Sequence, residues 1–211
     1  MTFTVAFRSL CWQVSTVAFV TLGCKPTGSG GFTAQGLSGP QILPPLPKPD
    51  LVLETTEGKR FDLKSETDGY LTLLFFGYTH CPDLCPVQLA NIATAMKGLD
   101  SAVNDRIKVV FVTVDPRRDT PAVMRAWLDH FDHRFIGLTG DSASIAYAFT
   151  QLRLGQPMEP APATADSSVY TVNHTVLVLA FTTDNLAHVA YPSGIRPDKW
   201  ASDLKLLVKG G

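Results

Sequence analysis

The sequence predicts an α/β protein in which a parallel β-sheet lies between two layers of helices. Two segments, Leu71–Phe76 and Ile107–Val114, are almost continuously apolar, which is typical of parallel strands covered on both faces. Segments with helical apolar spacing follow each of them. Pro86 and Pro121 suit the first turns of these helices, where a proline is tolerated because its missing N–H would be unpaired anyway. Strands and helices that alternate in this way form three-layer α/β domains.

The first 23 residues predict an export signal. Arg8 precedes an apolar stretch, Val14–Leu22, which is shorter than the about 20 residues that span a membrane. The stretch leads to Gly23-Cys24, which resembles a bacterial lipoprotein processing site, although the two residues before the glycine are not the usual ones. We expect Cys24 to carry a lipid, and a differently cleaved or uncleaved signal with a bystander Cys24 is the alternative.

Residues 24–46, rich in Gly, Ser and Pro, predict a flexible tether, and residues 47–209 predict the domain itself. Either form of the signal exports the domain, so we expect an anchored bacterial protein with its domain on the extracytoplasmic side of the cell membrane, where disulfides can form. The formal net charge of −1 without a basic run argues against nucleic acid as a partner.

The domain begins with a predicted hairpin, Asp50–Leu63, that turns at Glu57-Gly58. The first central strand, Leu71–Phe76, follows. The next helix should begin between Asp83 and Pro86, because proline cannot sit deeper than the first turn. Its apolar stripe comprises Leu89, Ile92, Ala93 and Met96.

The second central strand, Ile107–Val114, leads to a helix that Thr120 caps and Pro121 opens. The predicted buried face of this helix comprises Val123, Met124, Trp127, Leu128 and Phe131. A short strand at Phe135–Leu138 precedes a helix whose inward side chains are Ile145, Phe149 and Leu152. Gln156–Asp166 is predicted to be a loop.

The last elements are a strand at Tyr170–Phe181, its partner at Leu186–Tyr191, and a helix that starts at Pro197. The buried side of that helix comprises Trp200, Leu204, Leu207 and Val208. The order β-α-β-α-β-β-α with an extra helix predicts a thioredoxin-like three-layer fold with an added N-terminal β-hairpin.

Cys81 and Cys85 lie where the first central strand gives way to a helix. Ligands and chemistry gather at the carboxyl ends of such strands, and the positive end of the helix dipole favours thiolates. Cys11 would leave with the signal and Cys24 would carry lipid, so these two cysteines remain as a pair. Because so small a loop gains little stability from a crosslink, the pair is predicted to be functional, either as a redox-active dithiol that can close to a disulfide or as ligands of a soft metal.

His174 is the candidate third ligand. It lies at the start of the strand that would run beside the cysteine loop, where ordinary thioredoxins have a cis-proline that shields the dithiol from metals. Two thiolates and one imidazole suit Cu(I), or Cu(II) with an added ligand. Zinc also accepts this donor set, and a buried structural histidine is the alternative.

The other histidines are not expected to bind metal. We expect His130, His133 and His188 on the surface, and His80 to point away from the adjacent Cys81.

Two acidic residues and one methionine near the site are also assigned roles. We expect Asp83 to cap the helix after the cysteines, with a hydrogen bond to a partner protein as the alternative. We expect Asp115 to shape the loop after the second central strand. Met158 lies in the predicted loop and is a weaker candidate for a soft ligand.

Three motifs together resemble the Sco/SenC family of copper chaperones for cytochrome c oxidase assembly. They are GYTHCPDLCP at 77–86, TVDPRRDTP at 113–121 and VNHT at 172–175, and the similarity extends over roughly residues 47–208. The resemblance implies a membrane-tethered thioredoxin-like domain that holds Cu(I) or Cu(II) through Cys81, Cys85 and His174. It also implies that the chain helps to build the binuclear copper centre of oxidase subunit II, with an upstream copper donor or thiol reductant as a further partner.

Two departures from the family pattern affect the choice of partner more than copper binding. Asn173 occupies a position that is often Asp in the family, and the following turn reads AFTTDN instead of a tyrosine-rich sequence. A different copper protein as acceptor, or a redox-sensing role, therefore stays open.

A thiol–disulfide reductase with Cys81 as the attacking residue is the main alternative. A peroxiredoxin-like peroxidase is disfavoured because the Pro-x-x-x-Thr/Ser-x-x-Cys motif is absent before Cys81.

Overall fold

The computed structural model describes residues 1–2, 36–158 and 170–210. The strands of the folded unit are β1 (Gln41–Pro47), β2 (Val52–Thr55), β3 (Arg60–Asp62), β4 (Leu71–Gly77), β5 (Ile107–Thr113), β6 (Ile136–Thr139), β7 (Leu177–Phe181) and β8 (Leu186–Pro192). The helices are α1 (Leu63–Glu66), α2 (Leu84–Lys97), α3 (Ser101–Asn104), α4 (Pro121–Asp129), α5 (Ser142–Gln151) and α6 (Pro197–Gly210).

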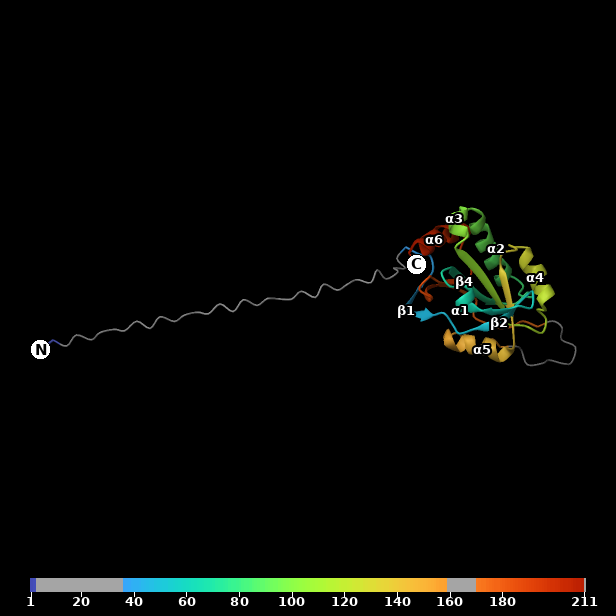
Figure 1. Cartoon of the computed structure of the whole chain (residues 1–211), viewed down its shortest axis with the longest axis horizontal. Helices are drawn as coiled ribbons and strands as arrows, with labels where there is room; N and C mark the ends of the chain where they lie inside the picture. The colour runs from blue at the N-terminus through green and yellow to red at the C-terminus, as the bar shows by residue number, and fades with distance from the viewer. Residues whose placement is uncertain (3–35, 159–169, 211) are drawn as a thin grey trace. The chain divides into compact units, whose positions relative to one another are not determined.

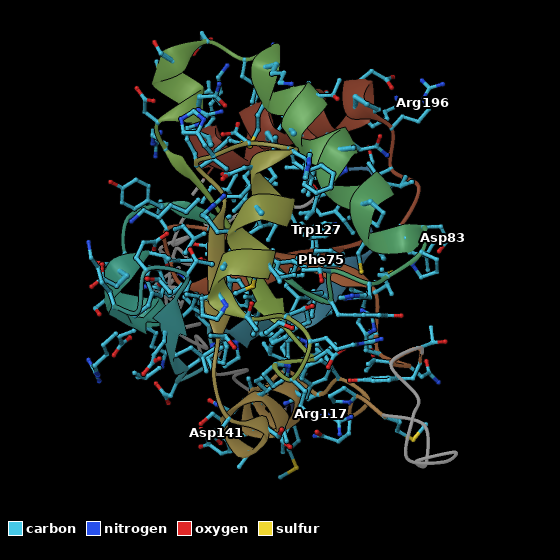
Figure 2. All side chains as sticks on the ribbon, turned by 90° about the vertical axis from the view of Figure 1, so that its right-hand side faces the viewer. Phe75, Asp83, Arg117, Trp127, Asp141 and Arg196 are labelled. Carbon is cyan, nitrogen blue, oxygen red and sulfur yellow. The ribbon has the colours of Figure 1, made fainter. Side chains whose placement is uncertain are left out.

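All of these strands belong to one sheet in the order β1-β8-β7-β4-β5-β6-β2-β3. The central strands β4, β5 and β6 are parallel, whereas β7 is antiparallel to β4 and β8 is antiparallel to β7. The units β4-α2-β5 and β7-β8-α6 thus place four strands in the order β8-β7-β4-β5, which is the arrangement of a thioredoxin-like fold. Helices cover both faces of the sheet (Figure 1; turned by 90° in Figure 2). The predicted three-layer thioredoxin-like fold is therefore confirmed.

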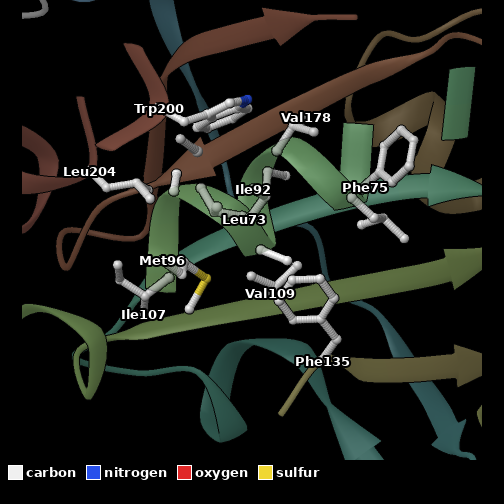
Figure 3. Packing of buried hydrophobic residues seen from close by; sticks show 14 of the residues in the cluster. Leu73, Phe75, Ile92, Met96, Ile107, Val109, Phe135, Val178, Trp200 and Leu204 are labelled. Carbon is white, nitrogen blue, oxygen red and sulfur yellow. The ribbon is translucent and has the colours of Figure 1, made fainter. Parts of the chain in front are cut away.

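The core consists of two apolar layers, one on each face of the sheet. On one face, Ile92 of α2 and Trp200 of α6 pack with Leu73 of β4 (Figure 3). On the other face, the ring of Phe149 on α5 lies 4.6 Å from that of Phe76 on β4. The side chains of β4 thus pack against helices on both sides.

Strand β4 is the central element of the sheet, and all seven of its residues are buried. It pairs with β5 in a parallel register that runs from Leu71 opposite Ile107 to Gly77 opposite Thr113. Because the two strands end at the same level, the loops that follow them begin side by side. One of these loops carries the cysteines.

The main helices begin where the sequence predicts. Asp83, Thr120 and Asp141 are the N-caps of α2, α4 and α5, and each accepts a hydrogen bond from a backbone N–H of its helix. Pro121 occupies the first turn of α4. The short helices α1 and α3 were not predicted, because four residues are too few to show helical periodicity. Within α4, Met124 and Leu128 are buried as predicted.

Val123, predicted to be buried, is instead 42% exposed. Successive residues of an α-helix lie about 100° apart, so the neighbour of a buried side chain can face solvent.

The predicted N-terminal hairpin is confirmed, since β2 and β3 pair antiparallel and β2 joins the sheet beside β6. The hairpin turns at Gly58, whose φ of +72° is accessible to glycine without strain.

The predicted tether is wrong at its end, because residues 41–47 form strand β1, which pairs antiparallel with β8. The sequence QILPPLP does not predict a strand, because proline has no N–H to donate to a neighbouring strand. Proline is tolerated in an edge strand such as β1, where only one side of the strand is paired. Lys48, the next residue, is buried, and its Nζ donates to Thr67 Oγ1 at 2.8 Å. This contact anchors the chain where it leaves β1.

Apart from residues 1–2, the predicted signal segment lies outside the described residues, as do Cys24 and the tether up to residue 35. Among the described helices, none is long and apolar enough to cross a membrane.

The predicted strand at Tyr170–Phe181 is wrong in its first half, since β7 begins only at Leu177. The pairing of β7 with β4 ends at Val178 opposite Phe75, and its pairing with β8 ends at Leu177 opposite Pro192, so residues 170–176 pair with neither strand. They form an irregular segment, residues 170–176, in which Asn173 makes an isolated bridge to Met158. Of the predicted loop at Gln156–Asp166, residues 156–158 are described and the rest lie outside the described part.

Candidate metal and thiol site

The two cysteines lie at the junction of β4 and α2, as the sequence predicts. Cys81 is half-buried in the loop, where its N–H donates to the carbonyl of Tyr78 at 3.2 Å. Cys85 is buried in the first turn of α2. Neither cysteine is part of a disulfide in the structure. Because Cys81 is only half-buried, it is the more accessible of the two cysteines.

The two sulfurs differ in protonation. A hydrogen bond from the Cys85 thiol lowers the pKa of Cys81 to about 6, and the backbone N–H groups of Cys85 and Asp83 act in the same direction, against the effect of burial. The Cys85 N–H lies 3.4 Å from the Cys81 sulfur, as expected for an anion at a helix N-terminus. The same shared proton, together with burial, raises the pKa of Cys85 far above its usual value. The site thus pairs one thiolate with one thiol.

His174 lies against this pair. Its Nε2 is 4.0 Å from the Cys85 sulfur, and its Nδ1 is 3.1 Å from the carbonyl oxygen of Val172. Because a carbonyl only accepts, Nδ1 carries the proton and the lone pair of Nε2 faces the sulfur. The ring meets Tyr78 edge-on at 5.6 Å between centroids. The arrangement matches the one found at metal-binding histidines, in which the second nitrogen is held by a hydrogen bond.

The donor set fits a small soft cation after a small adjustment. Metal bonds of about 2.3 Å to sulfur and about 2.0 Å to nitrogen place these two atoms roughly 3.6 Å apart, against 4.0 Å here. In the described part of the chain, no three His, Cys, Asp or Glu side chains already surround a common point at bonding distance. The three side chains would therefore have to move closer together to bind one ion.

The site is accessible through an open pocket of about 310 Å³. Cys81 and His174 both line it, together with apolar side chains such as Leu84 and Val172. A partner protein can therefore reach the more exposed sulfur and the imidazole from the same side.

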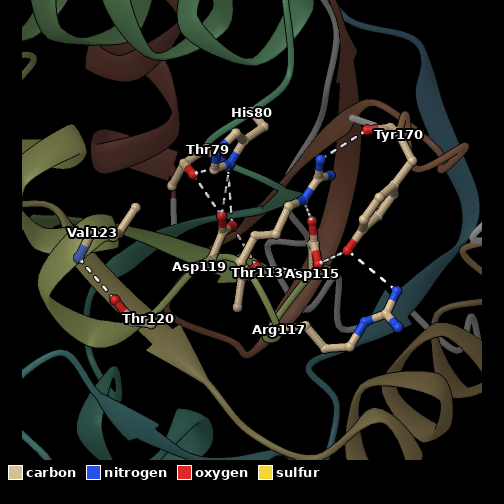
Figure 4. A network of polar contacts seen from close by, with 10 residues as sticks. Thr79, His80, Thr113, Asp115, Arg117, Asp119, Thr120, Val123 and Tyr170 are labelled. Atoms are coloured by element: carbon tan, nitrogen blue, oxygen red, sulfur yellow. Dashed lines mark hydrogen bonds and ion pairs between the residues drawn. The ribbon is translucent and has the colours of Figure 1, made fainter. Parts of the chain in front are cut away.

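Asp119 is a buried residue of the site that the sequence analysis missed. Its carboxylate accepts hydrogen bonds from the N–H of Thr79 at 3.0 Å, the hydroxyl of Thr79 at 2.5 Å and the hydroxyl of Thr113 at 2.6 Å (Figure 4). These bonds tie the cysteine loop to the loop after β5. Asp119 belongs to the motif TVDPRRDTP, which was the only signal in the sequence that could have identified it.

Two acidic residues have the structural roles expected of them. Asp83 is the N-cap of α2 and accepts from the N–H of Leu84 at 2.8 Å. Asp115 is buried and shapes its loop by pairing with Arg118 and by accepting a hydrogen bond from the hydroxyl of Tyr170. Met158 has an exposed side chain, and its backbone pairs with Asn173, the residue before His174.

The remaining histidines separate into three cases. His130 and His133 are exposed, as predicted. His80 is directed to Thr79 and Asp119, so its ring does not join the sulfurs. His188, predicted at the surface, is 8% exposed, and its Nε2 lies 2.8 Å from a carboxylate oxygen of Asp184. The prediction failed because β8 is not an edge strand: β1 pairs with it.

Comparisons with known proteins identify relatives of this chain. A protein from Mus musculus described as "Protein SCO2 homolog, mitochondrial" is 32% identical over 124 residues, which are 58% of this chain and 48% of that protein. A "SCO2-like protein" from Rickettsia felis is 42% identical over 96 residues, 46% of each chain. This chain thus spans about half the length of the curated relatives that it matches.

Solved structures show the same relationship in three dimensions. "Structure of Bradyrhizobium japonicum ScoI with copper bound" has a TM-score of 0.66 and 34% identity, and it covers 77% of this chain and 99% of that one. The apo Sco1 protein of Thermus thermophilus has a TM-score of 0.67 and 28% identity, with 85% and 96% coverage. The model of the family described as SCO1/SenC matches residues 48–209. The chain therefore belongs to the SCO1/SenC family.

Proposed function

We propose that this protein is a copper metallochaperone that holds copper through Cys81, Cys85 and His174. The observation that carries the proposal is the approach of the His174 Nε2 to the Cys85 sulfur at the end of β4, beside a second sulfur that is already a thiolate. Thiolates and an imidazole are the donors that Cu(I) prefers. Copper-bound structures of relatives with this fold support the same choice of metal.

Copper is the cargo in this proposal, and the open pocket allows its transfer. Binding requires that the Cys85 thiol give up its proton, since only thiolates ligate. Three protein ligands leave one side of the ion accessible through the pocket that Cys81 and His174 line. An incoming ligand of the acceptor can bind there before a ligand of this chain leaves, and Cys85 regains its proton when the copper has gone.

We infer that the acceptor is subunit II of cytochrome c oxidase, whose binuclear copper centre this family helps to assemble. An upstream protein would supply either copper or reducing equivalents. A lipid on Cys24 would hold the domain at the outer side of the bacterial cell membrane, close to such an acceptor. Asn173, next to His174, lies at the pocket rim and belongs to the surface that the acceptor would contact.

The unequal pKa values of the two thiols favour a second candidate function, that of a thiol–disulfide reductase. The Cys81 thiolate would attack a partner disulfide, forming a mixed disulfide and releasing one partner thiolate. Cys85 would then lose its proton and attack Cys81, so that the partner leaves fully reduced and a Cys81–Cys85 disulfide remains. A thiol reductant must restore the pair. A redox sensor would use the same disulfide without a dedicated substrate.

Copper titration of the reduced chain 25–211, followed by X-ray absorption, tests the first function. We expect one Cu(I) per chain with two sulfur ligands and one nitrogen ligand. If the chain binds no copper, but its Cys81–Cys85 disulfide is rapidly reduced and the resulting dithiol reduces the disulfide of an oxidised oxidase copper domain, the chaperone proposal fails and the reductase stands.

A further inference from the structure

Tyr170 opens the segment that carries His174, and Arg118 covers its ring. The guanidinium carbon of Arg118 lies 3.5 Å from the centroid of the Tyr170 ring, and its Nη1 donates to the Tyr170 carbonyl at 3.0 Å. The Tyr170 hydroxyl donates to Asp115 at 2.7 Å (Figure 4). Asp115 also pairs with Arg118. The side chain and the backbone of Tyr170 are thus both attached to the loop after β5.

The same guanidinium is linked to His174 through a second ring. Its carbon lies 5.6 Å from the centroid of the Tyr78 ring, and Tyr78 in turn packs edge-on against the imidazole of His174. Tyr78 is fully buried at the end of β4, and the Arg118 side chain is only 14% exposed. The planar guanidinium of Arg118 therefore lies between a buried ring of the core, Tyr78, and the first residue of the His174 segment, Tyr170.

We propose that Arg118 is a positioning residue for His174: by stacking on Tyr170 and Tyr78 it holds the segment 170–174 so that the imidazole stays beside the cysteines. The inference rests on the proposed copper function, because the position of the imidazole matters most when it completes a metal site. No contact between Arg118 and the metal is implied.

The backbone of this segment explains why a side chain is needed for the task. Residues 170–176 lie outside the sheet, and their described backbone pairing is the single bridge between Asn173 and Met158. Stacked rings and a buried ion pair must replace the hydrogen-bond ladder that would otherwise fix the chain. Arginine suits the position because its flat guanidinium stacks on rings and forms directed bonds at the same time, which lysine does not.

Two variants separate this role from a general loss of folding. Arg118→Lys keeps the charge near Asp115 but removes the planar stack. Tyr170→Leu removes the ring on which the Arg118 guanidinium stacks, and it leaves the ion pair between Arg118 and Asp115 intact. Arg134→Lys is the matched control, because Arg134 also pairs with an aspartate, Asp132, but lies just before the amino end of β6, away from the carboxyl ends of the strands where the cysteines lie.

The first readout uses the metal-free reduced chain. Nuclear Overhauser contacts between the rings of Tyr78 and His174, and amide exchange of residues 171–176, report the position of the segment. We expect both variants to lose the ring contact and to exchange faster, while circular dichroism and the alkylation rate of Cys81 stay as in the wild type. The control should retain the contact.

The second readout is copper itself. We expect both variants to bind Cu(I) about 10-fold to 100-fold more weakly, the loss typical of residues that orient a metal ligand, and to show weaker nitrogen coupling in the electron paramagnetic resonance spectrum of the Cu(II) form. Unchanged ring contacts and unchanged affinity in both variants would overturn the inference. If the wild type binds no copper, the proposed function fails, and the ring contacts still decide whether Arg118 holds His174.

Discussion

The Nε2 atom of His174 lies 4.0 Å from the sulfur of Cys85, although 89 residues separate the two in the chain. The proximity follows from the topology, since the strand β7 that comes after His174 pairs with β4, the strand that leads into the cysteine loop. The imidazole therefore lies where it can complete a site that the two sulfurs alone leave open.

Replacing His174 by Ala should remove copper binding and leave thiol chemistry in place. Loss of a residue that only orients a metal ligand can weaken metal binding by about 100-fold. We expect the Cu(I) affinity to fall by more than this, because His174 is proposed to be a ligand itself. Competition with a coloured Cu(I) chelator measures the affinity, and His130→Ala, at an exposed position, is the control. Reduction of a disulfide substrate should continue at a similar rate. An unchanged affinity would show that His174 is not a ligand.

Cys81 should remain reactive at acidic pH. Because its pKa is lowered to about 6, most of this sulfur is thiolate at pH 7, and the rate of alkylation by iodoacetamide should fall about tenfold between pH 7 and pH 5. In the unfolded chain the corresponding fall should occur near the ordinary thiol pKa, two to three pH units higher. Mass spectrometry of the chain 25–211, which lacks the other two cysteines, assigns the modified residue.

The variant Cys85→Ala provides the internal test of that explanation. The hydrogen bond from the Cys85 thiol is the largest cause of the lowered pKa of Cys81. Its removal should therefore move the midpoint of the alkylation profile to higher pH. If the midpoint stays near pH 6, the lowered pKa of Cys81 is caused by the helix N-terminus alone and not by the Cys85 thiol.

Asp119→Asn should loosen the cysteine loop and destabilise the domain. The buried carboxylate accepts three hydrogen bonds from Thr79 and Thr113, and an amide cannot accept all of them through its nitrogen. We expect a loss of about 1–3 kcal/mol in the free energy of unfolding, measured by urea denaturation. Asp129→Asn, at an exposed helical position, should change the stability by no more than about 0.5 kcal/mol. Equal stability of the two variants would contradict the role of Asp119.

Features of the site that depend on nearby residues could be predicted from the sequence. Pro86 fixed the start of α2, and with it the loop position of Cys81 and the helical position of Cys85. The burial of β4 and β5 was visible because both are continuous apolar runs. The place of His174 required more, namely the pairing order of a thioredoxin-like fold.

Features that depend on distant partners could not be predicted. Asp119 and Thr79 are 40 residues apart, and nothing in either segment indicates their hydrogen bonds. The buried state of His188 depends on β1, whose prolines resemble a linker. The strand before Leu177 was predicted from its β-forming residues, but β4 ends at Gly77 and offers no further partner.

Gly77→Ala should disturb the site without altering any ligand. A Cβ at Gly77 would lie 2.8 Å from Cε2 of Phe111 and 3.0 Å from the sulfur of Cys85, closer than packed atoms allow. Phe111 is fully buried in the core, so its ring cannot move aside easily, and the added methyl group must displace the sulfur. We expect a loss of about 1–3 kcal/mol in the free energy of unfolding, as for other overpacked cores, together with weaker Cu(I) binding.

The matched control for that substitution is Gly98→Ala after α2, where the nearest atom to an added Cβ is a carbonyl oxygen at 3.5 Å, an ordinary contact. Gly98 lies at the far end of α2 from Cys85, so this variant should bind copper like the wild type. Urea denaturation and chelator competition on both variants separate the two effects. If Gly77→Ala were as stable as the wild type and bound Cu(I) equally well, the sulfur of Cys85 would have room to move, and the close packing beneath the site would not define the position of this ligand.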